Sequence, residues 1–295
     1  MSATQSAPVL EVSDCQLNIH FSAPGFDVPD PDSVKKQITA ENTLFNWGGI
    51  KIARILPNVA VKFGSHVTVM EAKTMLFVSQ NTRTVPVPKI YAYYTHGPID
   101  RDVEECGSAF DTYIFMSFVE GQTLEKAWWT FDEATKQNVA DQLKGYLNEL
   151  RGITSPGYIG SVDFGPVTDQ LLENHSDRGP FDSEQDFDKA IIDAYQKRAP
   201  KRHIKSFLSG MLSQNKHRVV FTHGDLRLAN IMVHNGSVSG IVDWEQGGWY
   251  PEHWEFCRAL HIWQWQHDWT DYMLQVFQPY YPEYAIQSIL TEDLW

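Results

Sequence analysis

Cysteine is scarce in this sequence, and the few cysteines lie far apart. The chain has 295 residues and three cysteines, Cys15, Cys106 and Cys257, none of them in a C-x-x-C pair. This spacing argues against a disulfide framework and against cysteine-based zinc sites, and it is typical of a reducing compartment. The sequence therefore predicts a cytoplasmic protein.

Long apolar runs are also missing. No stretch approaches the roughly 18 apolar residues that a membrane-spanning helix needs. The first residues, MSATQSAPVL, lack the basic segment and the long apolar segment of a secretory signal. We therefore expect neither a membrane partner nor secretion.

Positive charge is in short supply. Lys and Arg number 24 against 37 Asp and Glu, which gives a net charge of −13. Such a chain repels phosphate backbones and anionic membranes, so nucleic acid is not an expected partner. The charge suits a cationic small substrate, but a solvated acidic surface is the simpler explanation. With 42% hydrophobic residues the chain can bury a core, and its length fits one large domain or two lobes.

Two familiar catalytic patterns are absent. Residues 236–240 read GSVSG, which places Val at the nucleophile position of the serine-hydrolase motif G-x-S-x-G. A metal site built from His223, Asp225 and His234 is conceivable, but no H-x-x-x-H or H-x-H spacing supports it.

The first part of the chain predicts a small sheet with one main helix. A Ser-, Asp- and Pro-rich arm occupies residues 1–30, and β-branched runs around Pro57 and Asn58 read as a hairpin. In chain order we expect a short helix over 31–41, strands over 50–56 and 59–63, a helix over 66–81, and strands over 85–94 and 112–119.

The second part predicts helices. Apolar residues recur at helical intervals over 131–153, and Thr130 and Glu133 are spaced as a capping box. Residues 157–188 read mostly as loop, 191–212 as helix on either side of Pro200, and the last forty or so residues as helix. That last part is rich in tryptophan, with Trp254, Trp263, Trp265 and Trp269.

These patterns define an α+β fold of two lobes. A small strand-rich N-lobe and a larger helical C-lobe are expected to meet near residues 117–122. We divide the chain into an N-terminal arm with a short helix (1–44), an N-lobe (45–119) and a C-lobe (120–295).

Residues 222–233, THGDLRLANIMV, carry the densest polar motif. Asn235-Gly236 comes directly after it and is a strong hairpin signal. A two-residue loop there would pair His234 with Ser237 and Met232 with Ser239, and it would set Asn230 opposite Ile241. Asp243 would then lie about 7 Å along the ribbon from Asn230, at about 3.3 Å per residue.

Asp225 enters the same hairpin, so three oxygen-bearing side chains, Asp225, Asn230 and Asp243, should converge at its open end. Mg²⁺ prefers one or two carboxylates together with phosphate and water oxygens. Asn230 and Asp243 could hold the metal while Asp225 deprotonates a substrate hydroxyl, which is the chemistry of phosphoryl transfer. The plain alternative is a hairpin with a polar rim, in which Asp225 and Asn230 only cap turns.

With these motifs in order, the chain resembles the aminoglycoside phosphotransferase and choline-kinase-like branch of the protein-kinase fold, and especially its fungal members. The resemblance covers most of residues 45–265. Its carriers are VAVK (59–62), EAKTMLFV (71–78), VPVPKIYAYY (85–94), YIFMSFVEGQTLEKAW (113–128), HGDLRLAN (223–230) and IVDWEQGGWYPEHWE (241–255).

The resemblance implies a role for each matching residue. Lys62 would grip the ATP phosphates and be held by Glu71, although Glu71 also completes a helix-capping box with Thr68. The backbone of Ser117 and Val119 would bind adenine. Asp225 would be the catalytic base, Asn230 and Asp243 the Mg²⁺ ligands, and His223 a brace for the loop.

The chain departs from the family in three places. The nucleotide loop, FNWGGIKI, has only Gly48 and Gly49 in place of G-x-G-x-x-G. Arg227-Leu228 replaces a frequent His-Pro, so Arg227 stands where protein kinases carry a phosphate-contacting Lys; it stabilises transition-state charge or pairs with surface carboxylates. Asp243-Trp244-Glu245 replaces Asp-Phe-Gly and keeps the metal ligand.

Only seven residues separate Asp243 from Pro251, too few for the loop on which protein kinases dock a peptide. A small hydroxylated molecule is therefore the expected acceptor. Trp249, Glu252, Trp254 and Glu255 could form an acidic, aromatic pocket for an amine; alternatively, the tryptophans are core residues of the helical lobe. The alternative class is an inactive nucleotide-binding pseudokinase, which the reduced glycine loop favours. The sequence does not set the acceptor, the choice of ATP or GTP, or the oligomeric state.

Overall fold

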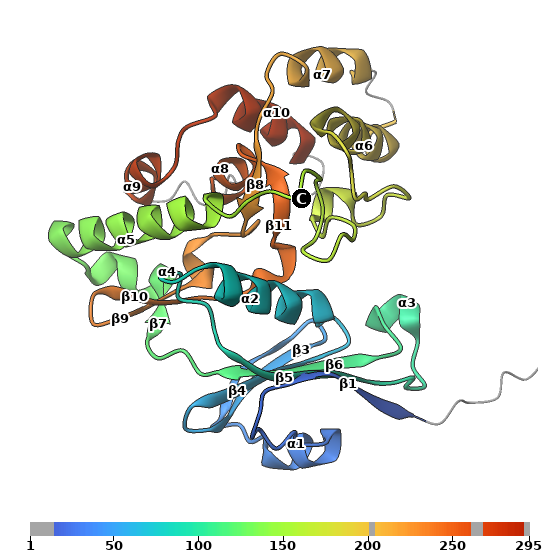
Figure 1. Cartoon of the computed structure of the whole chain (residues 1–295), viewed down its shortest axis with the longest axis vertical. Helices are drawn as coiled ribbons and strands as arrows, with labels where there is room; N and C mark the ends of the chain where they lie inside the picture. The colour runs from blue at the N-terminus through green and yellow to red at the C-terminus, as the bar shows by residue number, and fades with distance from the viewer. Residues whose placement is uncertain (1–14, 201–203, 261–267, 292–295) are drawn as a thin grey trace, which may run out of the picture. The chain divides into compact units, whose positions relative to one another are not determined.

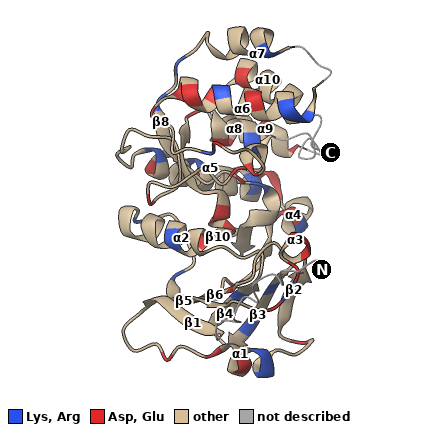
Figure 2. Cartoon of the chain, turned by 90° about the vertical axis from the view of Figure 1, so that its right-hand side faces the viewer, with Lys and Arg blue, Asp and Glu red and all other residues tan. Residues whose placement is uncertain are grey.

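The computed structural model describes residues 15–200, 204–260 and 268–291. Two compact units divide the chain (Figure 1): Met1–Val69 with Tyr91–Met116, and Met70–Ile90 with Ser117–Trp295. Asp and Glu occur on elements of both units, with Lys and Arg interspersed (Figure 2). Within the described ranges, no helix has the length and apolar character that a membrane crossing requires.

The first unit is built on an antiparallel sheet. Among the described residues its six strands are in the order β1-β5-β6-β4-β3-β2. The strands are β1 (Gln16–Ser22), β2 (Thr43–Trp47), β3 (Ile50–Leu56), β4 (Val59–Gly64), β5 (Ile90–Gly97) and β6 (Asp111–Ser117). Helix α1 (Pro31–Gln37) covers one face and inserts Val34 among buried Ala53, Val61 and Tyr113. A short helix, α3 (Val103–Cys106), precedes β6.

The structure corrects the sequence prediction at three strands of this sheet, one of which is β2, where no strand was expected. Part of the expected irregular arm is β1, which pairs antiparallel with β5. The strand expected over 85–94 begins only at Ile90, after the prolines Pro86 and Pro88. Proline lacks the N–H that a ladder requires, which explains the late start.

The second unit is mainly helical and contains α2 (Val69–Asn81) from the first part of the sequence. The helix α5 (Glu133–Arg151) packs on α9 (Trp269–Val276) and on β10. The remaining helices are α4 (Leu124–Ala127), α6 (Glu184–Arg198), α7 (Lys205–Leu212), α8 (Trp254–Ala259) and α10 (Tyr281–Thr291). Trp263 and Trp265, expected in a helix, lie outside the described residues.

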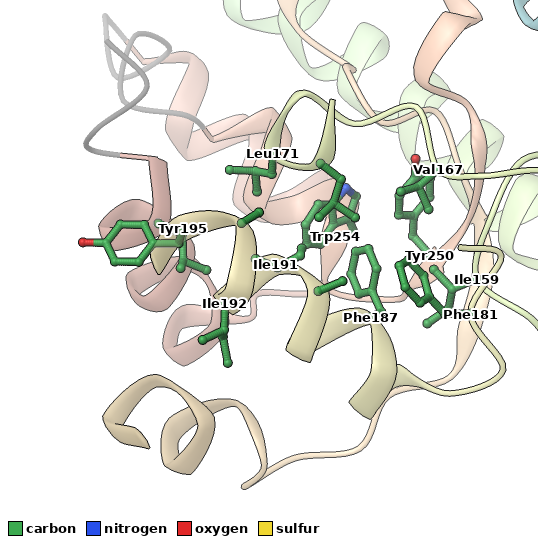
Figure 3. Close-up of a cluster of buried hydrophobic side chains, with 14 of the residues drawn as sticks. Ile159, Val167, Leu171, Phe181, Phe187, Ile191, Ile192, Tyr195, Tyr250 and Trp254 are labelled. Atoms are coloured by element: carbon green, nitrogen blue, oxygen red, sulfur yellow. The ribbon is translucent and has the colours of Figure 1, made fainter. Parts of the chain in front are cut away.

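Short strands carry the motif region. β7 (Gln122–Thr123), β9 (Ile231–His234) and β10 (Ser237–Ile241) form one sheet, and β8 (Val219–Thr222) pairs with β11 (Gly248–Pro251). A buried cluster around Phe187, Tyr250 and Trp254 joins α6, β11 and α8 (Figure 3). Stacked and edge-on ring contacts fix these three side chains to one another.

The helix cap expected for α5 is wrong. Asp132, not Thr130, is the N-cap, and its carboxylate accepts from the N–H of Thr135 at 2.8 Å. The Thr130 hydroxyl instead donates to the carbonyl of Ala127. Both residues can cap a helix, and the observed start at Glu133 places Asp132 at the capping position.

The predicted Asn235-Gly236 hairpin is confirmed, but its register slips by one residue. His234 faces Ser237 as expected, whereas a bulge between Val238 and Gly240 sets Met232 opposite Gly240 and Ile241 opposite Ile231. Asn235 and Gly236 both have positive φ, 51° and 74°, as the favoured hairpin turn demands.

Two glycine substitutions should have opposite effects. Gly236→Ala adds a Cβ at φ +74° and 3.3 Å from Thr135 Cγ2, whereas Gly210→Ala in α7 meets open space. We expect the first to lower the free energy of unfolding by about 1–2 kcal/mol and the second to raise it by up to about 1 kcal/mol. Urea unfolding measures both, and shifts of the same sign would contradict the assigned turn.

Candidate active site

The loop after β8 depends on a glycine. Gly224 has a φ of +86°, and a Cβ on it would lie 2.7 Å from the carbonyl oxygen of Gln246. Any side chain here would collide with backbone as well as strain its own conformation. The Gly of the His-Gly-Asp motif is therefore required by the close approach of residues 224 and 246, and it sets where Asp225 points.

Asp225 and Asn230 are brought together as predicted. The amide Nδ2 of Asn230 donates to Asp225 Oδ2 and to the Asp225 carbonyl, both at 2.8 Å. Backbone hydrogen bonds from Arg227 N to Asp225 O and from Asn230 N to Arg227 O close the turn between them. Both N–H bonds of the amide are thus used, which leaves Oδ1 of Asn230 as the atom that can face a cation.

Asp243 is held beside this loop through its neighbour Val242. The N–H of Val242 donates to the carbonyl of Asn230 at 2.9 Å, and the Val242 carbonyl accepts from His223 Nε2 at 3.0 Å. Asp243 itself is in the left-handed region, with φ 66° and ψ 59°. Non-glycine residues adopt it rarely, and Asp is among those that tolerate it. The contact between the loop and the hairpin therefore exists, although it is one residue away from the predicted register.

Three carboxylates, one of them that of Asp243, form a cluster. Oxygen atoms of Glu71, Asp243 and Glu245 lie within 4.8 Å of one another. Oxygen-only ligands of this kind suit a hard divalent cation such as Mg²⁺. Glu245 was not among the site residues predicted from the sequence, and its spacing two residues after Asp243 was the signal that could have identified it.

Arg227 forms an ion pair with the proposed base. Its Nε lies 3.1 Å from Asp225 Oδ2, and 46% of its side chain is exposed. Burial raises the pKa of Asp225, and the positive charges of Arg227 and Arg258 oppose that rise. The carboxylate that Arg227 contacts is thus that of Asp225, and a role for Arg227 in stabilising transition-state charge stays a prediction.

His223 is a neutral brace. It is fully buried, its Nδ1 accepts from the N–H of Asp225 at 3.2 Å, and its Nε2 donates to Val242. This pairing assigns the proton to Nε2. Burial lowers the pKa of His223, which keeps the ring uncharged at neutral pH.

Glu255 supports the same loop from beneath. Its buried carboxylate accepts from the backbone N–H of His223 at 2.5 Å and of Gly224 at 3.2 Å. Burial raises the pKa of Glu255, and the nearby His223 and these N–H donors work against the rise. Glu255 was expected in an acceptor pocket, and its function as a loop support was not foreseen.

The other three residues expected in that pocket also have different contacts. Trp249 is buried against the rings of Phe221 and Phe77. Trp254 lies in the core cluster of Figure 3, and its Nε1 donates to Asp169 at 3.3 Å. Glu252 binds Arg218 at 2.9 Å. The tryptophans are core residues, the alternative that the sequence left open.

The residues expected to bind adenine lie at the end of β6 and just beyond it. The N–H of Ser117 donates to the carbonyl of Lys89 at 2.8 Å, so this N–H is already engaged. The side chain of Val119 packs so closely on Gly240 that a Cβ there would lie 2.6 Å from it. Adenine recognition at this segment stays a prediction.

Lys62, Gly48 and Gly49 belong to the first unit. Lys62 is buried in the middle of β4, opposite Ile52 of β3. Gly48 and Gly49 form the tight turn between β2 and β3 with φ of 59° and 73°. The expected pairing of Lys62 with Glu71 would join the two units and stays a prediction.

The candidate site thus combines a carboxylate hydrogen-bonded to an amide five residues later with a hairpin Asp held next to the same loop. The protein-kinase-like α+β fold is shared with solved aminoglycoside phosphotransferases. A thermostable mutant of APH(4)-Ia in its apo form has a TM-score of 0.56 and 12% identity over 85% of this chain and 84% of its own. APH(2")-IIa with streptomycin and ATP has 0.53 and 14%, over 89% and 86%. ADP-bound APH(2'')-Ib has 0.53 and 15%, over 87% and 83%.

The model of the phosphotransferase enzyme family matches residues 67–286. The chain belongs to this family. A comparison with curated protein sequences finds no significant match.

Two glutamates three residues apart test the loop support. Glu255→Gln leaves backbone N–H groups of a buried loop facing an amide, and we expect a loss of about 1–3 kcal/mol in the free energy of unfolding. Glu252→Gln removes an ion pair whose Arg218 side chain is 75% exposed, and should cost less than about 1 kcal/mol. Chemical denaturation measures both variants, and equal losses would contradict the distinct role of Glu255.

Proposed function

We propose that the protein is an ATP- and Mg²⁺-dependent phosphotransferase that moves the γ-phosphate to a hydroxyl of a small metabolite, with amine-bearing metabolites as the first candidates. The observation that carries the proposal is the hydrogen bond from Asn230 to Asp225 Oδ2, in a loop that binds the backbone next to Asp243, whose carboxylate clusters with those of Glu71 and Glu245. It brings a base and a set of cation ligands together in one unit.

Asp225 is the base in this mechanism. Asn230 and Arg227 both contact Oδ2, and we assign Oδ1 to the acceptor hydroxyl. Asp225 orients that hydroxyl and takes its proton as the oxygen bonds to the γ-phosphorus and the bond to the leaving ADP oxygen breaks. Arg227, which contacts the base and is half-exposed, would neutralise charge on the transferring phosphoryl group.

Asn230 and Asp243 would hold the Mg²⁺. The Asn230 amide already spends its N–H groups on Asp225, so its oxygen is the free ligand, and the oxygens of Glu71 and Glu245 lie close to Asp243. Mg²⁺ bound there supplies charge neutralisation of the phosphate oxygens. Lys62 and the backbone of Ser117 and Val119 are proposed to bind ATP, as the family resemblance implies.

The acceptor is proposed to be a small molecule because the segment after Asp243 is short and buried. Residues 244–250 form a single 3-10 turn and most of β11, a strand buried against β8. That segment has no length left for docking a peptide. The net charge of −13 favours an acceptor that carries positive charge. The solved relatives with streptomycin, gentamicin or hygromycin B bound support this class of acceptor.

Replacing the base should abolish turnover without abolishing binding. Asp225→Asn is expected to lower kcat by about 10²–10⁴-fold, measured as ADP release with a panel of hydroxyl-bearing amines. The matched control is Asp163→Asn, which removes a half-exposed partner of Lys73 and should leave kcat unchanged.

The pseudokinase alternative makes the opposite forecast. If the unaltered protein turns over no acceptor in the panel, and Asp243→Asn leaves Mg²⁺-dependent nucleotide binding unchanged, the phosphotransferase proposal is wrong.

The pH dependence should report on Arg227. Its charge lowers the pKa of Asp225, so Arg227→Gln raises that pKa. Because the base acts only when deprotonated, the acid limb of the kcat/KM profile should move to higher pH, and Arg227→Lys should restore part of the shift. An unmoved limb in Arg227→Gln would show that the ion pair does not control the base.

A further inference from the structure

Two histidines and a glutamate converge in the second unit, on residues that the proposed transfer does not use. Glu184 begins α6, His217 precedes β8 and His253 precedes α8. One ligand atom from each lies within 4.8 Å of the other two. Three segments that are distant in the sequence thus place nitrogen and oxygen ligands around one point.

Both histidines present Nδ1 to the same glutamate oxygen. His217 Nδ1 lies 2.6 Å from Glu184 Oε1, and the backbone N–H of His217 donates to Oε2 of the same carboxylate at 2.9 Å. His253 Nδ1 lies 3.9 Å from Oε1, beyond hydrogen-bond distance. The two imidazole rings are close, with centroids 4.4 Å apart.

The His253 nitrogen is the second observation that points to a ligand. His253 is 4% exposed, and its Nδ1 has no hydrogen-bond partner among the described residues. Buried polar atoms in folded proteins are nearly always paired, so an orphaned nitrogen aimed at a carboxylate calls for a partner.

The surroundings of His217 match a known feature of metal sites. Its second nitrogen, Nε2, lies 3.4 Å from Oε1 of buried Glu283 on α10. Glu283 is itself held by the side-chain amide of Asn215. A carboxylate behind a histidine fixes the ring and the tautomer that leaves the other nitrogen free for a metal.

We propose that Glu184, His217 and His253 bind a divalent transition-metal ion, Zn²⁺ in the first place, with Glu283 orienting His217. Two imidazoles and one carboxylate form a zinc ligand set, and water would complete it. Mg²⁺ is disfavoured, because it prefers oxygen ligands throughout. The ion would replace the direct contact between His217 Nδ1 and Glu184 Oε1.

The ion would crosslink separate segments of the second unit and so stabilise its fold. Its ligands connect the start of α6, the segment before β8 and the segment before α8, and Glu283 adds α10. None of these ligands belongs to the base or to the proposed Mg²⁺ site. The proposal is therefore independent of the phosphotransfer activity.

Zinc binding by the full-length protein tests the site. After dialysis against a chelator and then into chelator-free buffer, titration with ZnCl₂ in the absence of nucleotide should show one equivalent bound. The melting temperature should rise by roughly 5–10 °C at a zinc concentration about 100 times Kd. Co²⁺ in place of Zn²⁺ should give the visible absorption of a four-coordinate nitrogen and oxygen site.

Variants separate this site from other zinc ligands. His253→Gln and Glu184→Gln should each weaken binding at least 100-fold and remove the Co²⁺ spectrum, and Glu283→Gln should weaken it by about 10-fold. His234→Gln, at an exposed histidine, and Asp243→Asn, in the proposed Mg²⁺ site, should bind as tightly as the unaltered protein.

Binding that survives His253→Gln, or that is lost in Asp243→Asn, would overturn the assignment. So would the absence of any zinc binding by the unaltered protein. Circular dichroism of each variant without metal shows whether it folds. If His253→Gln does not fold, the Glu184→Gln and Glu283→Gln affinities decide the question.

Discussion

The hydrogen bond between the Asn230 amide and the Asp225 carboxylate is the contact on which the rest of the site depends. It fixes the carboxylate and, by using the amide N–H groups, determines which atom of Asn230 faces a cation. The surrounding structure holds the two residues in place. Gly224 lets the loop approach Gln246, His223 connects Asp225 to the hairpin, and Glu255 binds the loop backbone from below. Buried polar networks of this kind are rigid only when every member is satisfied.

Two carboxyl groups of this site, those of Asp225 and Glu255, have different surroundings, and we therefore assign them different roles. Asp225 pairs with Arg227, whose side chain is partly exposed to solvent, so the Asp225 carboxylate would be able to accept a proton and release it again. Glu255 is enclosed and spends its oxygens on backbone N–H groups, so its role is to hold the loop in shape. Burying a carboxylate costs desolvation energy, even when it accepts several hydrogen bonds. Those bonds in turn hold the loop in one position, and accurate positioning is what group transfer requires.

The sequence predicted best what short-range chemistry decides. Asn235-Gly236 specified its hairpin, and the spacing from Asp225 to Asn230 specified their contact, because few backbone paths satisfy either. The sequence-based predictions were wrong where the local structure is set by contacts with segments that are distant in the sequence. At the bulge between Val238 and Gly240, a Cβ on Gly240 would collide with Val119, a residue more than a hundred positions earlier, and Trp254 is buried against Phe187 of α6. The predicted cap of α5 was wrong for a local reason. Thr130 and Asp132 can both cap a helix, and the sequence does not show that the first turn begins at Glu133.

The left-handed backbone at Asp243 has a consequence for how the site can change over evolution. At a φ of 66°, most side chains would strain the turn after β10, and the β-branched ones most of all. Asn and Gly are the replacements that the backbone accepts without penalty. Mutational drift at this position therefore leads most easily to a protein that keeps its fold and loses a charge. If Asp243 binds the metal as proposed, a single Asp243→Asn substitution would give a protein that folds but has lost a charged metal ligand.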